Sequence, residues 1–261
     1  TISDSTMTSN TANKYALYIV GSDSNTITRS YISNPAGNGA GLNTGADYNT
    51  ISDSTMTSAG IGSYYALYIY DSDSNIVTRS YISNPSGYGA RLYFGADYNT
   101  ISDSIMTSDS GSYYVLSISI SSSNTVSGSY VHGLAYITGS TGTVIGGSIF
   151  VTDTVTGSAL QLAGGSLNLA LSSSTLSGGT QGAGIYLDEN NSGIINLSSN
   201  TITGGAYGLN IATQAAGATL SITSMTFSSL TAGATAINFL GGQFVSTFTG
   251  VGFNSANIAV N

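Results

Sequence analysis

The sequence has no cysteine, no tryptophan, two prolines and only four basic residues among its 261 residues. Without cysteine there is no disulfide and no thiolate chemistry. Phosphate binding needs clustered Lys and Arg. The basic residues are Lys14, Arg29, Arg79 and Arg91, against twelve acids, so a typical nucleic-acid partner is excluded. No run of about eighteen apolar residues is present, so no segment is expected to span a membrane.

The remaining composition favours a β-rich protein with an uncharged polar surface. Hydrophobic residues make up 41% and charged residues 6%, and there are 34 glycines and 18 tyrosines. Frequent β-branched residues and no helical apolar spacing predict strands. The chain starts at Thr1 with neither Met nor a leader, so we expect a processed product or a piece of a longer chain. Together with the scarcity of lysine, this predicts an extracellular or cell-surface location.

Internal repeats are the strongest signal in the sequence. Residues 1–9 recur as residues 50–58 and, with Ile105 in place of Thr, as residues 100–108. Residues 28–35 recur at 78–85. The region 1–123 is therefore built from near-identical units of about 50 residues, and 124–261 from more divergent, more apolar ones. We expect one domain over residues 1–261.

Each unit contains two coils, because a shorter pattern recurs about every 25 residues. In this pattern an apolar residue is followed three positions later by a small or amide residue and five positions later by another apolar residue. Its members include Ile2/Ser5/Met7, Ile27/Ser30/Ile32, Val144/Gly147/Ile149 and Leu197/Asn200/Ile202. An apolar-x-apolar strand lies between successive members, as at Leu17/Ile19, Leu42/Thr44, Leu92/Phe94 and Ile185/Leu187. Both patterns occur about eleven times, which predicts an all-β parallel solenoid of about eleven coils.

The segment 193–202, GIINLSSNTI, resembles the pectate-lyase-like right-handed parallel β-helix superfamily, and most closely its β-helix repeat proteins of bacterial and archaeal surfaces. The resemblance implies a right-handed β-helix along the whole chain. In that family an inward Asn ladder occupies the second position of the pattern, whereas here Ser is usual and Asn occurs only at Asn200. The resemblance also implies that the sheet of the apolar-x-apolar strands faces the substrate groove of the family's enzymes.

The outward middle residues of these strands form a candidate surface for a glycan or another partner. Tyr, Asn and Gln side chains can stack on sugars and bond their hydroxyls, although aromatic rungs can also simply stack to strengthen the sheet. The predicted face comprises Tyr18, Asn43, Tyr68, Tyr93, Tyr136, Gln161, Tyr186, Asn210 and Asn238. A further row has the same two interpretations and alternates Tyr31, Tyr81 and Tyr130 with Thr6, Thr55 and Ile105.

A charged column is expected two positions after the first apolar residue of the pattern. Stacked coils would align acids and arginines with alternating sign, as either a charged binding strip or an ion-pair ladder. We favour a structural ladder that fixes which coil stacks on which. Its members are Asp4, Arg29, Asp53, Arg79 and Asp103.

The sequence offers no clear catalytic or metal site. Glycoside hydrolases need paired carboxylates flanking the bond, whereas Asp188 and Glu189 are adjacent and should diverge. Residues 71–75, DSDSN, are spaced like a calcium loop but lack its glycine and its closing glutamate, so a turn is favoured. His132 is the only histidine. We therefore expect no catalytic residue, no enzyme activity, no cofactor and at most weak Ca²⁺ binding at loop acids.

Both ends of the predicted solenoid carry apolar residues and no capping helix. We expect either end-to-end stacking into filaments or continuation in a longer chain. The stacking candidates are Ile2, Met7, Phe248, Phe253, Ile258 and Val260. The predicted function is a non-catalytic extracellular structural protein of a surface filament, layer or adhesin stalk. The alternative is a polysaccharide-binding or divergent polysaccharide-cleaving protein that uses the Tyr/Asn face.

Overall fold

A computed structural model describes residues 1–261 except 167, 242–244, 255–258 and 261. Among the described residues every regular element is a β-strand, and no helix is long and apolar enough to cross a membrane. In the described part of the chain the strands wind as a parallel β-helix with three main sheets, A, B and C, each of eleven strands. The predicted fold class is therefore confirmed. The chain forms two compact units, Thr1–His132 and Gly133–Asn261, and the single domain expected over residues 1–261 stays a prediction.

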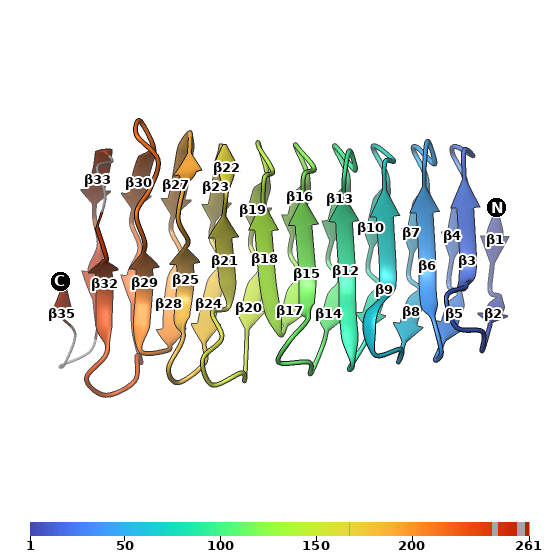
Figure 1. The fold of residues 1–261 in the computed structure, drawn as a ribbon, viewed down its shortest axis with the longest axis horizontal. Coiled ribbons are helices and arrows are strands. Elements are labelled where there is room, and N and C mark those ends of the chain that lie inside the picture. The colour runs from blue at the N-terminus through green and yellow to red at the C-terminus, as the bar shows by residue number, and fades with distance from the viewer. Residues whose placement is uncertain (167, 242–244, 255–258, 261) are drawn as a thin grey trace. The chain divides into compact units, whose positions relative to one another are not determined.

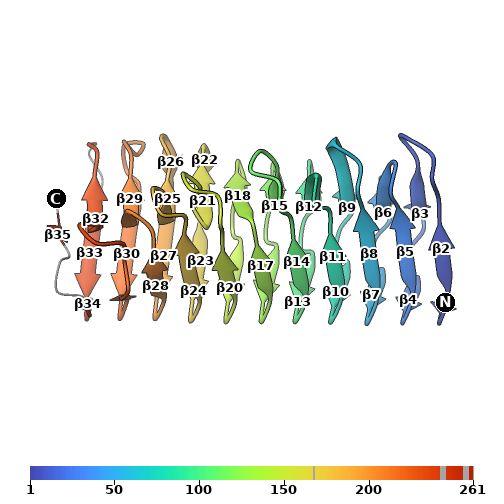
Figure 2. The ribbon, with the colours of Figure 1, turned by 90° about the horizontal axis from the view of Figure 1, so that it is seen from below.

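In the first unit each coil contributes one strand to each sheet in turn, and sequence-adjacent coils pair in parallel (Figures 1 and 2). Sheet A contains β1 (Ile2–Ser3), β4 (Thr26–Thr28), β7 (Thr50–Ser52), β10 (Ile76–Thr78), β13 (Thr100–Ser102) and β16 (Thr125–Ser127). Sheet B contains β2 (Thr6–Thr8), β5 (Tyr31–Asn34), β8 (Thr55–Ser58), β11 (Tyr81–Ser83), β14 (Ile105–Thr107) and β17 (Tyr130–His132). Sheet C contains β3 (Tyr15–Val20), β6 (Asn38–Asn43), β9 (Gly62–Tyr70), β12 (Gly87–Tyr93) and β15 (Tyr114–Ser119).

The second unit repeats this order with less regular coils. Sheet C contains β18 (Leu134–Thr138), β21 (Leu160–Ala163), β25 (Ala183–Leu187), β29 (Tyr207–Ile211), β32 (Thr235–Phe239) and β35 (Ala259–Val260). Sheet A contains β19 (Val144–Gly146), β23 (Leu169–Ser172), β27 (Ile194–Ser198), β30 (Thr219–Thr223) and β33 (Val245–Thr249). Sheet B contains β20 (Ile149–Val151), β24 (Thr175–Gly178), β28 (Thr201–Gly204), β31 (Thr226–Phe227) and β34 (Gly252–Phe253). A small pair joins β22 (Gly165–Ser166) and β26 (Asn191–Ser192).

The core consists of apolar rows that point inward from each sheet. In sheet A of the first unit, Ile27, Ile51, Val77 and Ile101 stack in register and are all 0% exposed. Burying one such side chain contributes about 1.5–3 kcal/mol. Since every coil repeats the row, burial is continuous along the unit.

The corner between sheets A and B depends on one residue with a left-handed backbone in every coil. In the first unit Asp4, Arg29, Asp53, Arg79 and Asp103 take φ values of 47–50° there. Such values are uncommon outside glycine, and Asp tolerates them better than a long side chain does. The conformation turns the chain between two short strands and directs these charged side chains outward.

The next residue at this corner points inward and forms a serine ladder. The Oγ of Ser54 donates to Ser52 O at 2.7 Å and accepts the Ser30 N–H at 3.1 Å. The neighbouring coils repeat both bonds, and in the second unit Asn200 Oδ1 accepts the Ser174 N–H at 3.0 Å. Serine therefore satisfies the same backbone donor here that asparagine satisfies at Asn200.

A second ladder, of asparagine, lies at the corner between sheets C and A, and our sequence reasoning missed it. Backbone N–H groups of Asn25, Asn49, Asn75 and Asn99 each donate to Oδ1 of the asparagine one coil further on, at 2.8 Å. The last acceptor is Asn124. Each member immediately precedes a sheet A strand, which is a signal visible in the sequence.

Two predicted registers are wrong. In the second unit Ile145, Ser148 and Phe150 point inward, not Val144, Gly147 and Ile149, which lie one residue earlier. In sheet C the inward pairs are Ala40/Leu42 and Ala90/Leu92, two residues before those predicted. A shift of one residue exchanges the two faces of a strand, and a shift of two keeps the face but changes the row.

Candidate functional site

The outward face of sheet C in the first unit has two rows. The first row contains Tyr18, Gly41, Tyr68, Arg91 and Ser117, paired across β3, β6, β9, β12 and β15. The second row contains Val20, Asn43, Tyr70, Tyr93 and Ser119. The structure thus places Tyr18 and Tyr68 in one predicted row but moves Asn43 and Tyr93 to its neighbour. Arg91 takes the position that we had assigned to Tyr93.

Tyrosines within the strands β3 and β9 stack on one another. The ring centroids of Tyr15 and Tyr18 are 4.6 Å apart, and those of Tyr65 and Tyr68 are also 4.6 Å apart. A side chain at Gly41 would collide with the Tyr15 ring, because a Cβ there would lie 2.6 Å from Tyr15 Cε1. The missing side chain at position 41 therefore lets the Tyr15 ring cover that part of the row.

Arg91 lies at the centre of this aromatic surface. Its guanidinium carbon is 4.2 Å from the ring centroid of Tyr93, 5.5 Å from Tyr88 and 5.7 Å from Tyr65. Its Nη1 donates to the Tyr65 hydroxyl at 2.9 Å, and its Nε is buried without a hydrogen-bond partner in the described protein. At these distances the rings attract the guanidinium by cation–π interaction. We call Tyr15, Tyr18, Tyr65, Tyr68, Tyr70, Tyr88, Arg91 and Tyr93 the sheet C aromatic surface.

Burial changes the acidity of this surface. Burial raises the pKa of the Tyr15 and Tyr68 hydroxyls well above the usual value for tyrosine. Charge repulsion from neighbouring tyrosines raises the pKa of both further. Arg91 opposes the shift at Tyr68 only partly. The Tyr15 and Tyr68 hydroxyls are protonated at neutral pH and can both donate and accept hydrogen bonds.

In the second unit the predicted row is in register throughout. Tyr136, Gln161, Tyr186, Asn210 and Asn238 pair across β18, β21, β25, β29 and β32. Asn238 Nδ2 donates to Asn210 Oδ1 at 2.9 Å. This row is a run of amides and phenols on the outward face.

One carboxylate lies against that row. Asp188 Oδ2 accepts from Gln161 Nε2 at 2.9 Å, and its Oδ1 accepts from the Tyr186 hydroxyl at 3.3 Å. Burial, with a contribution from Asp188, raises the pKa of Tyr186. In the sequence Asp188 stands out only as the neighbour of Glu189. Its contact with Gln161, which lies one coil away, becomes visible only in the fold.

The charged column lies at the left-handed corner between sheets A and B. Arg29 Nε lies 2.7 Å from Asp4 Oδ1, and Arg79 Nε lies 2.8 Å from Asp53 Oδ1. Hydrogen bonds from these arginines lower the pKa of Asp4 and Asp53. Asp103 acts on Arg79 through charge. All four paired groups lie at the surface, so their role as a register ladder remains a prediction.

Loop acids at the corner between sheets C and A bond to the backbone. Oδ1 of Asp47 accepts the Asp73 N–H at 2.7 Å, and Oδ1 of Asp73 accepts the Asp97 N–H at 2.8 Å. Burial raises the pKa of Asp73. Within the described residues no group of three or more His, Cys, Asp or Glu could hold a metal ion. Weak Ca²⁺ binding at loop acids remains a prediction.

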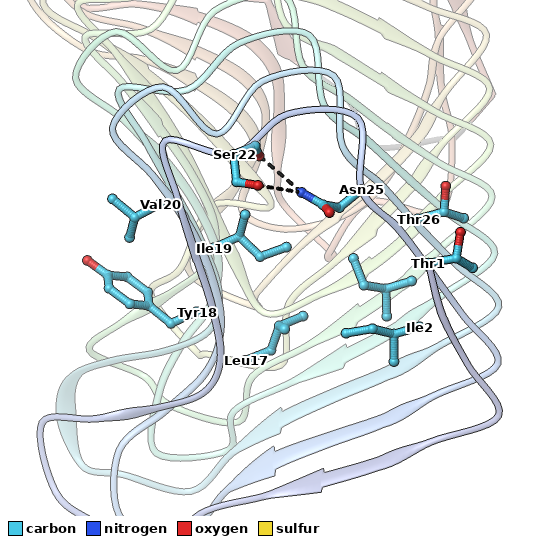
Figure 3. A pocket seen from close by; sticks show the side chains of 10 residues that line it. Thr1, Ile2, Leu17, Tyr18, Ile19, Val20, Ser22, Asn25 and Thr26 are labelled. Atoms are coloured by element: carbon cyan, nitrogen blue, oxygen red, sulfur yellow. Dashed lines mark hydrogen bonds between the residues drawn. The ribbon is translucent and has the colours of Figure 1, made fainter.

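The stacking candidates lie at two separate places. In the first coil a pocket is lined by ten residues that include Ile2, Leu17 and Ile19. The side chains of Leu17 and Ile19 point into the pocket, and that of Tyr18 points away from it (Figure 3). Met7 is half-buried. In the second unit Phe248 and Phe253, 39% and 44% exposed, line an apolar pocket. Ile258 lies outside the described residues, as does the side chain of Val260, and end-to-end association remains a prediction.

The family comparison identifies the fold from the sequence. A model of the right-handed β-helix region matches residues 1–150 and 65–227. The chain belongs to the right-handed β-helix family. This confirms the resemblance drawn from the repeats. A search of curated proteins finds no match.

Solved structures with a similar fold include two enzymes and a tailspike protein. An alginate lyase from Paenibacillus matches at 12% identity and TM-score 0.45 over 98% of this chain and 99% of its own. The Dettilon tailspike protein matches at 14% identity and TM-score 0.49 over 97% and 59%. The catalytic unit of an α-1,3-glucanase from Streptomyces thermodiastaticus matches at 11% identity and TM-score 0.40 over 96% and 65%. At such identities these likenesses show the fold alone.

One prediction about activity needs correction. We expected that the chain is not an enzyme, and that prediction is contradicted, because the similar structures named above include an alginate lyase and the catalytic unit of a glucanase. A fold by itself does not decide between a catalytic and a non-catalytic role. The predicted role in a filament, layer or stalk also gains no support from these comparisons.

Proposed function

We propose that this protein is an extracellular polysaccharide-binding β-helix protein that holds a glycan chain on its sheet C aromatic surface. The observation that carries the proposal is Arg91, whose guanidinium lies among the rings of Tyr65, Tyr88 and Tyr93. Aromatic faces stack on the apolar faces of sugars, and a guanidinium donates several hydrogen bonds in a fixed plane. The uncharged hydroxyl- and amide-rich surface and the scarcity of lysine support an extracellular location.

The arrangement fits an elongated ligand better than a small one. Tyr18, Tyr68 and Arg91 occur on β3, β9 and β12 of one outward row, and strands in a sheet are about 4.8 Å apart. A glycan running across the strands would meet a ring or the guanidinium on most coils. In the second unit the row with Gln161, Tyr186 and Asn210 supplies further hydroxyl-binding groups of the same chemistry.

Affinity electrophoresis tests the proposal directly. Wild-type protein is run through native gels that contain alginate, polygalacturonate, an α-glucan or a β-glucan, and its retardation is compared with that of Arg91→Ala and Tyr68→Ala. We expect retardation by at least one polymer and its loss in both variants. Tyr48→Ala is the matched control, because Tyr48 is 65% exposed on the corner after β6 and lies outside the sheet C aromatic surface.

Cleavage is measured on the polymer that the protein retains. New reducing ends or unsaturated chain ends would show that binding leads to bond breaking. If no polymer in the panel retards the wild-type protein, or if Arg91→Ala is retarded equally, the proposed binding surface is wrong.

A further inference from the structure

A row of tyrosines on the outward face of sheet B has no part in the surface proposed above. Tyr31, Tyr81 and Tyr130 lie on β5, β11 and β17, in register with Thr55 and Ile105 on the strands between them. The three tyrosines are 44%, 40% and 39% exposed. The strands β5, β8, β11 and β14 stand side by side in Figure 2.

A hollow lies between the first two tyrosines, over the strand β8 that pairs with both of their strands. Its walls include the Tyr31 and Tyr81 rings, and hydroxyls line it between them, with Thr57 Oγ1 donating to Ser33 Oγ at 2.9 Å. The hollow is lined by Tyr31, Ser33, Pro35, Thr57, Ser58, Ala59, Tyr81, Ser83 and Pro85. None of these residues is charged, and rings beside hydroxyls are the groups that bind sugars.

The charge at the edge of this hollow is already balanced. Arg29 and Arg79 stand two residues before Tyr31 and Tyr81, and each makes two hydrogen bonds to one aspartate. The Arg29 bonds to Asp4 are 2.7 and 2.8 Å, and the Arg79 bonds to Asp53 are 2.8 and 2.9 Å. With both guanidiniums paired in this way and a net charge of −8 on the chain, a neutral ligand is favoured over an anionic one.

The spacing of the tyrosines indicates the form of the ligand. Two strand spacings separate Tyr31 from Tyr81 and Tyr81 from Tyr130, or about 9.6 Å in each case. A β-1,4-linked chain turns over at each sugar, so only every second sugar presents the same face. We propose that sheet B of the first unit binds a neutral, extended β-1,4-linked polysaccharide, with every second sugar stacked on Tyr31, Tyr81 and Tyr130.

This second surface is independent of the sheet C aromatic surface, and its test keeps the two apart. Hydroxyethyl cellulose and cello-oligosaccharides of two, four and six sugars are titrated into wild-type protein, and binding is followed by calorimetry. The affinity should rise with length, by roughly tenfold as the ligand becomes long enough to reach a further tyrosine. Dimers that bind as tightly as hexamers would contradict the periodic arrangement.

Paired variants assign the binding to the tyrosines. Tyr31→Ala with Tyr81→Ala should weaken hexamer binding by at least roughly tenfold. Tyr81→Phe, which keeps the ring and loses its contact with the Thr107 hydroxyl at 3.3 Å, should retain most of it. The control is Tyr48→Ala with Tyr98→Ala, which removes two tyrosines that are 65% and 63% exposed and also one double coil apart.

The same titrations in Arg91→Ala protein separate this proposal from the proposed function. Hexamer binding that survives in Arg91→Ala and is lost with Tyr31 and Tyr81 supports the sheet B surface, even if the sheet C proposal fails. Hexamer binding that is lost in Arg91→Ala but kept in the double variant Tyr31→Ala with Tyr81→Ala overturns the sheet B proposal. So does the absence of any binding to hydroxyethyl cellulose.

Discussion

The asparagine ladder makes a quantitative prediction about stability, and Asn99→Ala tests it best. Asn99 is 0% exposed, its Oδ1 accepts the Asn75 N–H at 2.8 Å, and its Nδ2 donates to Ser72 O at 3.0 Å. Removing the amide leaves two buried backbone groups without partners. At about 1–3 kcal/mol for each group, the expected loss is about 2–6 kcal/mol. A typical domain is stable by only about 5–15 kcal/mol, so the loss should be easily measured.

Urea unfolding at 25 °C, followed by far-ultraviolet circular dichroism and by tyrosine fluorescence, measures this loss. Both probes are needed because coils of a solenoid can unfold separately. The matched control is Asn10→Ala, since Asn10 is an exposed asparagine and surface substitutions usually change stability by less than about 0.5 kcal/mol. If Asn99→Ala costs no more than Asn10→Ala, the ladder does not support the corner and the reasoning is refuted.

Three further predictions follow from particular contacts. Burial raises the pKa of Tyr15 and Tyr68, so their neutral forms contribute stability that is complete below the unfolded value of 10.0 and is lost as pH rises above it. The urea midpoint of unfolding should therefore fall above pH 10. It should fall less in the double variant Tyr15→Phe with Tyr68→Phe. Arg79→Gly should leave the thermal midpoint unchanged or raised, whereas Arg79→Val should lower it, because glycine accepts a φ of 47° without strain and a β-branched residue does not. Gly41→Ala should displace the Tyr15 ring and reduce near-ultraviolet dichroism, and an unchanged spectrum would contradict the packing.

The repeats predicted the fold because the inward rows must be apolar in every coil. Spacing alone could not fix the face of β19, where Val144 and Ile145 are both apolar and Gly146 and Gly147 can both turn. The structure places Gly147 at the left-handed corner with φ of 59°, which sends Ser148 inward at the corner. A neighbouring coil was needed to choose between the two registers.

The candidate surface was predicted only in part, for a related reason. Ala40 and Ala90 point inward, but alanine is a weak apolar marker, so the strands were assigned two residues late. That error hid Arg91, which the sequence had presented only as one of four scattered basic residues. The contact of Arg91 with Tyr65 joins different coils across strands whose register shifts near Gly87, and no spacing rule predicts it.

The central claim is that a glycan occupies the sheet C aromatic surface, and footprinting of exposed tyrosines tests it most directly. Nitration with and without the retained polysaccharide, read by mass spectrometry, reports which rings the ligand covers. We predict protection of Tyr18, Tyr70 and Tyr93, and unchanged modification of Tyr48. Equal modification of Tyr18 and Tyr93 with and without the polysaccharide would contradict the claim.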